Sequence, residues 1–514
     1  MIYDVKKEEN MTKKGIIYFM IGLFVIMGFW ILVGSYFSQL DPEPSEGEEV
    51  YKNEAFGYKY IYNDNLKIDL DLEKIKTVIE GQDMKIEIYY DNFSDSINDT
   101  KNLVNYGNEN IKDNDYIEIL FEDTTHKYGM KTLSTQWKRK KLNSIDKDLN
   151  YYTLFQYIID KDEAYTVMIK SNEKIDHKDY IWKIGFIDKT GEIDDLNMAK
   201  LKPENLPDKN TRAGQMYETV FDKEKELIWG IFYPEANKGN YDKLYELEEK
   251  LDYEFKVLLE YKGLNTEAYS NLFEIENRII EYTFQVLGNN DDPVVMYEIL
   301  EGKYDKLINQ VAEEIKKYKG DVLFRLNNEM NGDWCSYSAW FTQTDTDIYN
   351  EVWVYFYEIF EEKGVDNALW VWNPNWGDFP EFKWNHYLNY FPGEKYVDIV
   401  GLTGYNTGTY YQHEYWREFE EIYDPMLEEY TEYFNYELMI TEFGSNSVGG
   451  DKAEWIEKMM KKIKEYDIDI ALWFSSIDYD SEGNPARIYI VDENEKTLNA
   501  FKKGLELYYD KKQR

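Results

Sequence analysis

Short apolar runs recur through the C-terminal half of the chain, and they constrain the fold more than any other feature. Each run is short enough to be a buried strand, and segments with helical periodicity separate them. Eight such runs in roughly 250 residues predict an α/β fold, a parallel (β/α)8 or TIM barrel at 223–510. The runs are 227–233, 255–260, 294–300, 322–326, 368–372, 397–402, 438–441 and 470–474.

Two kinds of parallel fold alternate strands and helices in this way. A doubly wound open sheet is the alternative to a barrel, but the chain has no Gly-rich phosphate-binding loop of the kind that accompanies it. The helical segments suit a barrel: Leu307, Val311 and Ile315 lie on one helix face, and Asp451 with Glu454 is a capping-box-like helix start.

Two of the runs end in a carboxylate. The fourth passes into Asn327, Asn328 and Glu329, and the seventh passes into Glu442. The C-terminal ends of barrel strands meet on one face, where active sites lie, and strands four and seven stand opposite each other. Glycoside hydrolysis uses two carboxyl groups in this way, one as acid/base and one as nucleophile. The alternative is a structural pair satisfied by neighbours such as Arg325.

Five segments of residues 223–510 resemble glycoside hydrolase family 26, the β-mannanase family of a large clan of retaining hydrolases. Each lies at the end of a strand-like run, and they follow the order of the family. They are Arg325-Leu-Asn-Asn-Glu-Met-Asn-Gly-Asp-Trp334, Trp370-Val-Trp-Asn-Pro-Asn-Trp376, Asp398-Ile-Val-Gly-Leu-Thr-Gly-Tyr405, Ile440-Thr-Glu-Phe-Gly444 and Ala471-Leu-Trp-Phe474.

The resemblance implies roles for four polar residues. Glu329 would be the general acid/base and Glu442 the nucleophile. Tyr405 would hydrogen-bond and orient Glu442, and Arg325 would lie beneath the carboxylates and keep Glu442 ionised. An acid must be protonated near neutral pH, so Glu329 needs a pKa raised by burial or by a neighbouring negative charge.

The resemblance also implies substrate-binding residues. Trp473 would floor the subsite of the reacting sugar, and Trp334 would line the cleft; core packing is the alternative for Trp473, as it is for Tyr405. Trp376 is a further candidate for contact with substrate, and a structural role is its equal alternative. Members of the family commonly have His before the acid/base, where this chain has Asn328. An Asn can donate to the sugar 2-hydroxyl, where mannosides and glucosides differ, so the choice between them stays open.

Charge and aromatic content bear on the partner. The net charge of −41 opposes nucleic acid and anionic glycans. The 48 Tyr and 14 Trp offer rings that can stack on the apolar faces of neutral sugars. A neutral polysaccharide is therefore the expected partner.

The sequence predicts no metal and no organic cofactor. Cys335 is the one cysteine, so no intrachain disulfide is possible, and the four histidines lack metal-ligand spacing. The stretch 478–483 resembles the start of a calcium loop, but Tyr489 stands where a bidentate Glu is required.

The N-terminal segment predicts a membrane anchor. Lysines mark the tail 1–14, an apolar helix long enough to span a bilayer follows at 15–37, and 38–55 is an acidic linker. This order predicts a single-pass protein of the cell membrane with its C-terminal domains outside. A cleaved signal peptide is the alternative, although the apolar stretch is long for one.

Residues 56–185 predict a small α+β domain, joined to the barrel by a connector at 186–222. Strand-like runs lie at 58–62, 85–90, 153–159 and 164–169, with a helical piece at 101–114. Gly57-Tyr-Lys-Tyr-Ile-Tyr-Asn63, Trp137 and Tyr151-Tyr-Thr-Leu-Phe155 resemble the PsbP-like domains of bacterial surface proteins. A binding or spacer role is expected.

Together these features predict a membrane-anchored, extracellular, retaining endo-β-glycanase that acts on a neutral β-linked polysaccharide, β-mannan first. A β-glucanase acting on an exopolysaccharide and a non-catalytic glycan-binding barrel are the alternatives. The oligomeric state stays open.

Overall fold

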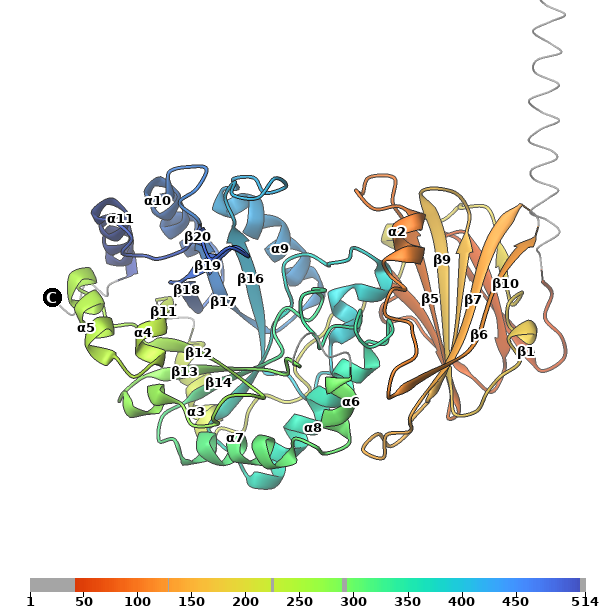
Figure 1. Ribbon diagram of the computed structural model, residues 1–514, viewed down its shortest axis with the longest axis horizontal. Coiled ribbons are helices and arrows are strands. Elements are labelled where there is room, and N and C mark those ends of the chain that lie inside the picture. The colour runs from red at the N-terminus through yellow and green to blue at the C-terminus, as the bar shows by residue number, and fades with distance from the viewer. Residues whose placement is uncertain (1–41, 128, 223–225, 289–293, 509–514) are drawn as a thin grey trace, which may run out of the picture. The chain divides into compact units, whose positions relative to one another are not determined.

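The chain folds into two compact units (Figure 1). The computed structural model describes residues 42–127, 129–222, 226–288 and 294–508. Unit 1 contains the chain up to Thr100 with 117–139 and 149–198, and unit 2 contains 101–116, 140–148 and the chain from Ala199 onward. The predicted anchor at 15–37 lies outside the described residues, and no helix within them has the length and apolarity to span a bilayer.

Unit 1 is built from two antiparallel sheets. A seven-stranded sheet has the order β3 (Lys67–Asp69), β4 (Lys76–Glu80), β5 (Met84–Asn92), β9 (Glu163–Ser171), β8 (Tyr151–Ile158), β7 (Met130–Arg139) and β6 (Ile117–Lys127). A three-stranded sheet has the order β1 (Glu48–Asn53), β2 (Tyr58–Asn63) and β10 (Ile184–Phe186).

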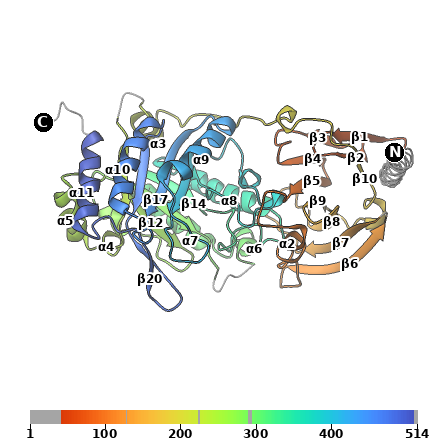
Figure 2. The same cartoon turned by 90° about the horizontal axis from the view of Figure 1, so that it is seen from above.

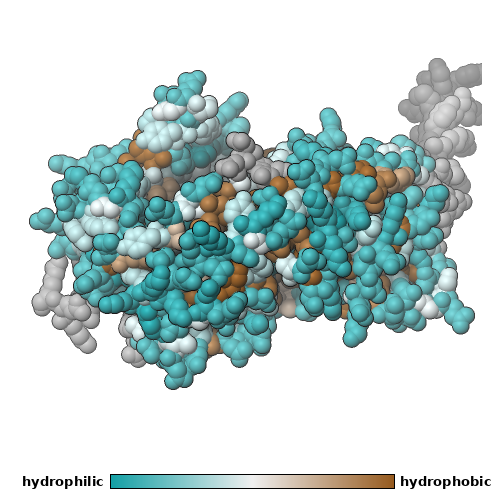
Figure 3. Space-filling view, turned by 60° about the horizontal axis from the view of Figure 1, so that its bottom comes forward, coloured by the Kyte–Doolittle hydropathy of each residue, from teal (hydrophilic) through white to brown (hydrophobic). Residues whose placement is uncertain are grey.

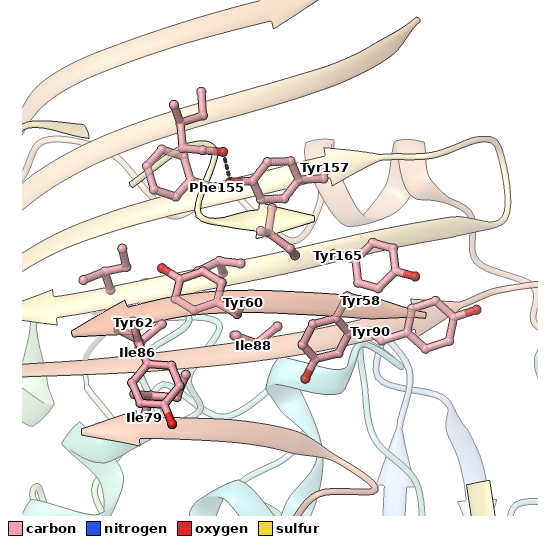
Figure 4. Close-up of a cluster of buried hydrophobic side chains, with 14 of the residues drawn as sticks. Tyr58, Tyr60, Tyr62, Ile79, Ile86, Ile88, Tyr90, Phe155, Tyr157 and Tyr165 are labelled. Atoms are coloured by element: carbon pink, nitrogen blue, oxygen red, sulfur yellow. Dashed lines mark hydrogen bonds between the residues drawn. The ribbon is translucent and has the colours of Figure 1, made fainter. Parts of the chain in front are cut away.

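Tyrosine and isoleucine side chains of both sheets form the core of unit 1 (Figure 4). Alternate residues of β5, among them Ile86 and Ile88, point into this cluster, as the two-residue period of a strand requires. Two of its buried tyrosines donate to backbone carbonyls: Tyr157 to that of Ile181 at 2.6 Å, and Tyr165 to that of Phe56 at 2.6 Å. Much of the abundant tyrosine is therefore structural.

Unit 2 is a closed barrel of eight parallel strands, which confirms the predicted (β/α)8 architecture. The strands are β11 (Ile228–Phe232), β12 (Val257–Gly263), β13 (Ile279–Gln285), β14 (Val322–Leu326), β15 (Ala368–Trp372), β16 (Ile399–Asn406), β17 (Glu437–Ser445) and β18 (Ile470–Phe474). A small hairpin follows, made of β19 (Ile477–Tyr479) and β20 (Pro485–Ile488).

Helices surround the strands of unit 2 (Figure 2). They are α4 (Pro234–Asn237), α5 (Tyr241–Leu251), α6 (Val295–Leu300), α7 (Asp305–Lys317), α8 (Asp347–Lys363), α9 (Phe419–Tyr433), α10 (Lys452–Lys462) and α11 (Glu495–Leu505). The predicted cap of α10 is present, because Asp451 accepts hydrogen bonds from the backbone N–H groups of Ala453 and Glu454.

One of the eight predicted strands is wrong. The run 294–300 forms helix α6, and the third strand of the barrel is β13 (Ile279–Gln285). The inner face of β13 carries Glu281, Thr283 and Gln285, so the strand alternates polar and apolar residues and lacks the continuous apolar run that marks the other strands.

Helix α3 (Arg212–Val220), within the predicted connector, belongs to unit 2 and packs on the apolar interior of the barrel. Met216 and Val220 join one cluster with strand residues that include Val257 and Leu323. These strand residues lie at the N-terminal half of their strands, so α3 covers the end opposite the predicted site. Polar groups concentrate at the other end.

Two segments far from the barrel in sequence belong to the same compact unit, 101–116 with helix α2 (Thr100–Asn105) and 140–148. The ring of Tyr106 stacks on Trp340 with centroids 5.2 Å apart, and Trp340 Nε1 donates to the Tyr106 carbonyl at 3.0 Å. The Tyr106 hydroxyl donates to Asp333. This contact supports the loop that follows β14, where Glu329 and Trp334 lie.

Candidate active site

A buried guanidinium stands at the centre of the barrel. Arg325, on β14, is fully buried, and its Nη2 donates to Glu442 Oε2 at 2.7 Å. Its Nε lies 2.8 Å from Oε1 of the equally buried Glu281 on β13. The structure therefore brings Arg325 and Glu442 together, and it adds a third group, Glu281, that the sequence analysis missed together with its strand.

Three donors hold Glu442, on β17. Arg325 and the Tyr261 hydroxyl both donate to Oε2, and the Tyr405 hydroxyl donates to Oε1 at 3.1 Å. Donors on both oxygens fix the rotamer of the Glu442 carboxylate. Tyr405 lies where the resemblance implied. Tyr261, at the end of β12, was missed, although it follows the second predicted run directly.

The residues around Arg325 form a polar layer that crosses five strands. Asn373 Oδ1 accepts from Arg325 Nη1 at 2.9 Å, from Thr403 at 3.0 Å and from Thr441 at 2.9 Å. Thr283 accepts from Arg325 Nε at 2.8 Å. Because a buried charge is costly unless its donors are satisfied, this layer is what allows Arg325 to sit inside the barrel.

Glu329 follows β14 in an unusual backbone conformation. Its φ is 56°, and that of Asn327 is 49°. The left-handed region costs a residue with a Cβ roughly 1–2 kcal/mol. Backbone hydrogen bonds hold the turn: the N–H of Glu329 donates to the carbonyl of Asn373 at 2.8 Å, and that of Asn327 to the carbonyl of Phe284 at 2.9 Å. Strain of this kind is common at functional sites.

The surroundings of Glu329 favour its protonated form. Burial, and then the negative charge of Glu442, raise its pKa to about 8, although Arg325 and a hydrogen bond from Trp334 act in the opposite direction. The side chain of Glu329 is therefore neutral at pH 7, as a general acid must be.

Asn328 is buried beside the acid/base candidate. Its Oδ1 accepts from Gln285 Nε2 at 3.0 Å, and its backbone carbonyl accepts from the Tyr337 hydroxyl at 2.7 Å. The contact with Gln285 directs the Oδ1 end of the amide toward β13 and the donating Nδ2 end away from it.

The predicted role of Trp473 is wrong. Its side chain is fully buried against Phe443 and Phe501, and its Nε1 donates to the carbonyl of Tyr489 at 2.8 Å. Successive residues of a strand point to opposite faces, so the neighbouring Phe474 points inward instead. Phe474 is partly exposed and meets the ring of Tyr405 edge to face at 5.8 Å.

Trp334 and Trp376 are exposed, by 47% and 41% of their surface, on the loops that follow β14 and β15. The indole of Trp334 lies directly against Gly332, where a Cβ would come within 2.4 Å of its ring. A glycine at 332 is thus required for the observed position of Trp334. Both tryptophans are accessible to a ligand, as predicted for substrate-binding residues.

Comparison with known proteins finds a family model that matches part of this barrel. The model of glycosyl hydrolase family 26 matches residues 273–472, a segment that contains Arg325, Glu329 and Glu442. This part of the chain therefore resembles glycosyl hydrolase family 26. The matched segment covers β13 to β17 entirely and most of β18.

Two curated relatives are similar to part of this chain. The chain is 29% identical to Endoglucanase H of Acetivibrio thermocellus over 182 residues, which are 34% of this chain and 20% of that protein. It is 34% identical to a mannan endo-1,4-beta-mannosidase of Bacillus subtilis over 120 residues, 22% of this chain and 32% of that protein. The chain thus spans less than a third of the length of each.

A solved structure is also similar. The catalytic domain of the GH26 endo-beta-1,4-mannanase of Bacillus sp. JAMB-750 matches with a TM-score of 0.43 at 18% sequence identity, covering 60% of this chain and 93% of that chain.

The positions of Trp473 and Phe474 give opposite predictions for two variants. Trp473→Ala should lower the free energy of unfolding by about 3–5 kcal/mol, because it opens a large cavity. Phe474→Ala should destabilise less and lower hydrolytic activity per folded molecule more. Urea unfolding and activity, both normalised to folded protein, check this. Normal stability with lost activity in Trp473→Ala would restore the original assignment.

The protonation of Glu329 predicts an alkaline limit to activity. The rate constant kcat/KM should fall as pH rises through about 8, because Glu329 loses the proton that it must donate. In Trp334→Phe this limit should move to higher pH, because the variant lacks the hydrogen bond by which Trp334 stabilises the ionised form of Glu329 in the wild type. The matched control is Trp376→Phe, which should leave the limit in place. A limit that is the same in all three proteins would contradict the assignment.

Proposed function

We propose that the barrel is a retaining endo-β-glycanase that hydrolyses a neutral β-linked polysaccharide, with β-mannan the first candidate. One observation carries the proposal: a carboxylate fixed by three donors, Glu442, shares a site with a carboxyl group, Glu329, whose pKa is raised to about 8. Double displacement at a glycosidic bond needs one protonated carboxyl group, which donates its proton, and a second carboxyl group, which attacks the anomeric carbon.

In the first proposed step Glu442 attacks the anomeric carbon while Glu329 donates its proton to the glycosidic oxygen. The bond from carbon to the leaving oxygen breaks, and a glycosyl ester of Glu442 forms. In the second step Glu329, now ionised, takes a proton from water, the water oxygen attacks the anomeric carbon, and Glu442 leaves as a carboxylate. Arg325, Tyr261 and Tyr405 stabilise the charge of Glu442 before the first step and after the second.

The sugar is the finer part of the proposal. One relative is named a mannan endo-1,4-beta-mannosidase and another an endoglucanase. Asn328 supports a contact at the 2-hydroxyl, which is axial in mannosides and equatorial in glucosides. A β-glucan, such as an exopolysaccharide of the cell, is therefore the second candidate. The presence of both carboxyl groups argues against a non-catalytic glycan-binding barrel.

Release of reducing ends from a panel of β-mannan, glucomannan, mixed-linkage β-glucan and cellulose tests the proposal. We expect hydrolysis of at least one neutral glycan by the wild-type chain and none by Glu442→Ala. Hydrolysis of β-glucans alone would replace the first candidate with the second. Binding without any hydrolysis would indicate the non-catalytic barrel.

Azide rescue tests the two roles. Glu442→Ala has no nucleophile, and azide entering the vacated space should give a glycosyl azide of inverted configuration. Glu329→Ala should still form the glycosyl ester from an activated aryl glycoside, and azide should then release a product of retained configuration. Proton NMR of the azides distinguishes the two anomers. The same anomer from both variants would contradict the assignment.

We also propose that the enzyme is anchored in the cell membrane through residues 15–37 with the barrel outside, and that the part of residues 56–185 that belongs to unit 1 acts as a binding or spacer domain. The uncharged run between lysines and acids supports the anchor. Recovery of the full-length chain in the soluble fraction of lysed cells would contradict it.

A further inference from the structure

Large apolar side chains gather beside the candidate site. On the face drawn in Figure 3 hydrophilic residues predominate, with hydrophobic ones in small groups. Single exposed apolar side chains need no explanation, but a contiguous set does. Such a set begins at Trp334 and continues through Phe379 and Trp376 to Tyr415, with exposed fractions of 47%, 40%, 41% and 59%. We call these residues, with Arg417, the aromatic row.

Successive members of the row are in contact. The ring of Trp334 lies 5.5 Å from that of Phe379, which lies 6.2 Å from that of Trp376. The guanidinium of Arg417 continues the row, with its Cζ 4.5 Å from the Trp376 ring and 4.3 Å from the Tyr415 ring. Four rings and a guanidinium plane offer more surface than a single pyranose ring can cover.

Hydrogen bonds fix the base of the row. Asn331 Nδ2 donates to Asp378 Oδ1 at 2.9 Å and to the carbonyl of Gly377 at 3.0 Å, and the N–H of Phe379 donates to the carbonyl of Asn331 at 2.8 Å. Arg417 is held between the rings of Trp376 and Tyr415, and its Nη2 donates a hydrogen bond to the Tyr415 hydroxyl at 2.5 Å. A surface held in this way loses little conformational entropy when a ligand binds.

The row starts at the acid/base candidate. The N–H of Gly332 donates to the carbonyl of Glu329 at 3.0 Å, and the indole of Trp334 lies against Gly332. The row extends from there over the loops that follow β14, β15 and β16. In the proposed reaction Glu329 protonates the oxygen of the leaving group, so the sugars beside Glu329 are those on the leaving-group side of the cleaved bond. Glu442 reacts with the sugar on the other side.

We propose that the aromatic row binds the leaving-group half of a neutral β-linked polysaccharide, over more than one sugar, and so makes the barrel endo-acting. This inference rests on the proposed function. The apolar C–H faces of gluco- and manno-configured sugars stack on the rings, and the N–H groups of Arg417 donate to ring hydroxyls. Phe379, Tyr415 and Arg417 are thereby assigned a binding role in addition to the two tryptophans.

The variants Phe379→Ala, Tyr415→Ala and Arg417→Leu in the full chain test the row. The matched control is Tyr245→Ala, because Tyr245 lies on α5 and is 45% exposed. For the polysaccharide that the panel identifies, each row variant should raise KM about tenfold, which corresponds to about 1.4 kcal/mol. The control should match wild type. Row variants that match the control would overturn the inference.

A second experiment tests on which side of the cleaved bond the aromatic row binds sugars. Oligosaccharides labelled at the reducing end report how many sugars leave with the label, and wild type should release labelled fragments of several sugars. In the row variants cleavage should move toward the reducing end, because long leaving groups lose their stacking partners. Movement toward the non-reducing end would show that the row binds the other half and would overturn the inference.

Binding separates this inference from the proposed function. In a Glu442→Gln background, titration calorimetry with the same polysaccharides should show weaker binding in the row variants and unchanged binding in Tyr245→Ala. If wild type hydrolyses nothing but this pattern holds, the row is a glycan-binding surface and the hydrolytic proposal fails alone. If no glycan of the panel binds, the row inference fails.

Discussion

The site depends on one buried guanidinium. Arg325 is enclosed in the barrel with carboxylates on two sides, Glu281 and Glu442, at 2.8 and 2.7 Å. Removing such charges from water costs several kcal/mol each unless hydrogen bonds replace the lost hydration. The strands around Arg325 therefore carry amide and hydroxyl groups, and the apolar cluster under α3 begins below this layer. A barrel that places a cation here must be polar at one end and apolar at the other.

The position of Arg325 also gives the two candidate catalytic groups, Glu329 and Glu442, different electrostatic surroundings. Arg325 donates a hydrogen bond to Glu442, whereas at Glu329 burial and the charge of Glu442 outweigh the cation and raise the pKa to about 8. Burial likewise raises the pKa of Glu281 to about 8 despite its ion pair with Arg325. Three carboxyl groups around one cation cannot all be ionised at low cost, and the geometry gives the best donors to Glu442.

Strands with a continuous apolar run could be predicted from the sequence, whereas a strand that alternates polar and apolar residues was missed. Seven of the eight strands were found because their apolar runs are nearly continuous, whereas β13 was missed because Glu281, Thr283 and Gln285 interrupt it. The partner of Arg325 was lost with that strand. The error at Trp473 has the same origin, because a two-residue period means that a shift of one position moves a side chain from the pocket to the core. Glu329, Glu442 and Tyr405 were found because motifs fix their positions.

Contacts between residues distant in sequence left no local pattern to find. Tyr106 and Asp333 are 227 positions apart, yet their hydrogen bond supports the loop that carries Trp334. Asn331 fixes the same loop from its other side through Asp378 and Gly377. The aromatic row thus starts on a loop that is restrained from two directions. The same restraint serves Glu329. Its left-handed backbone conformation and its buried, protonated side chain persist only where the surrounding loops are held in place.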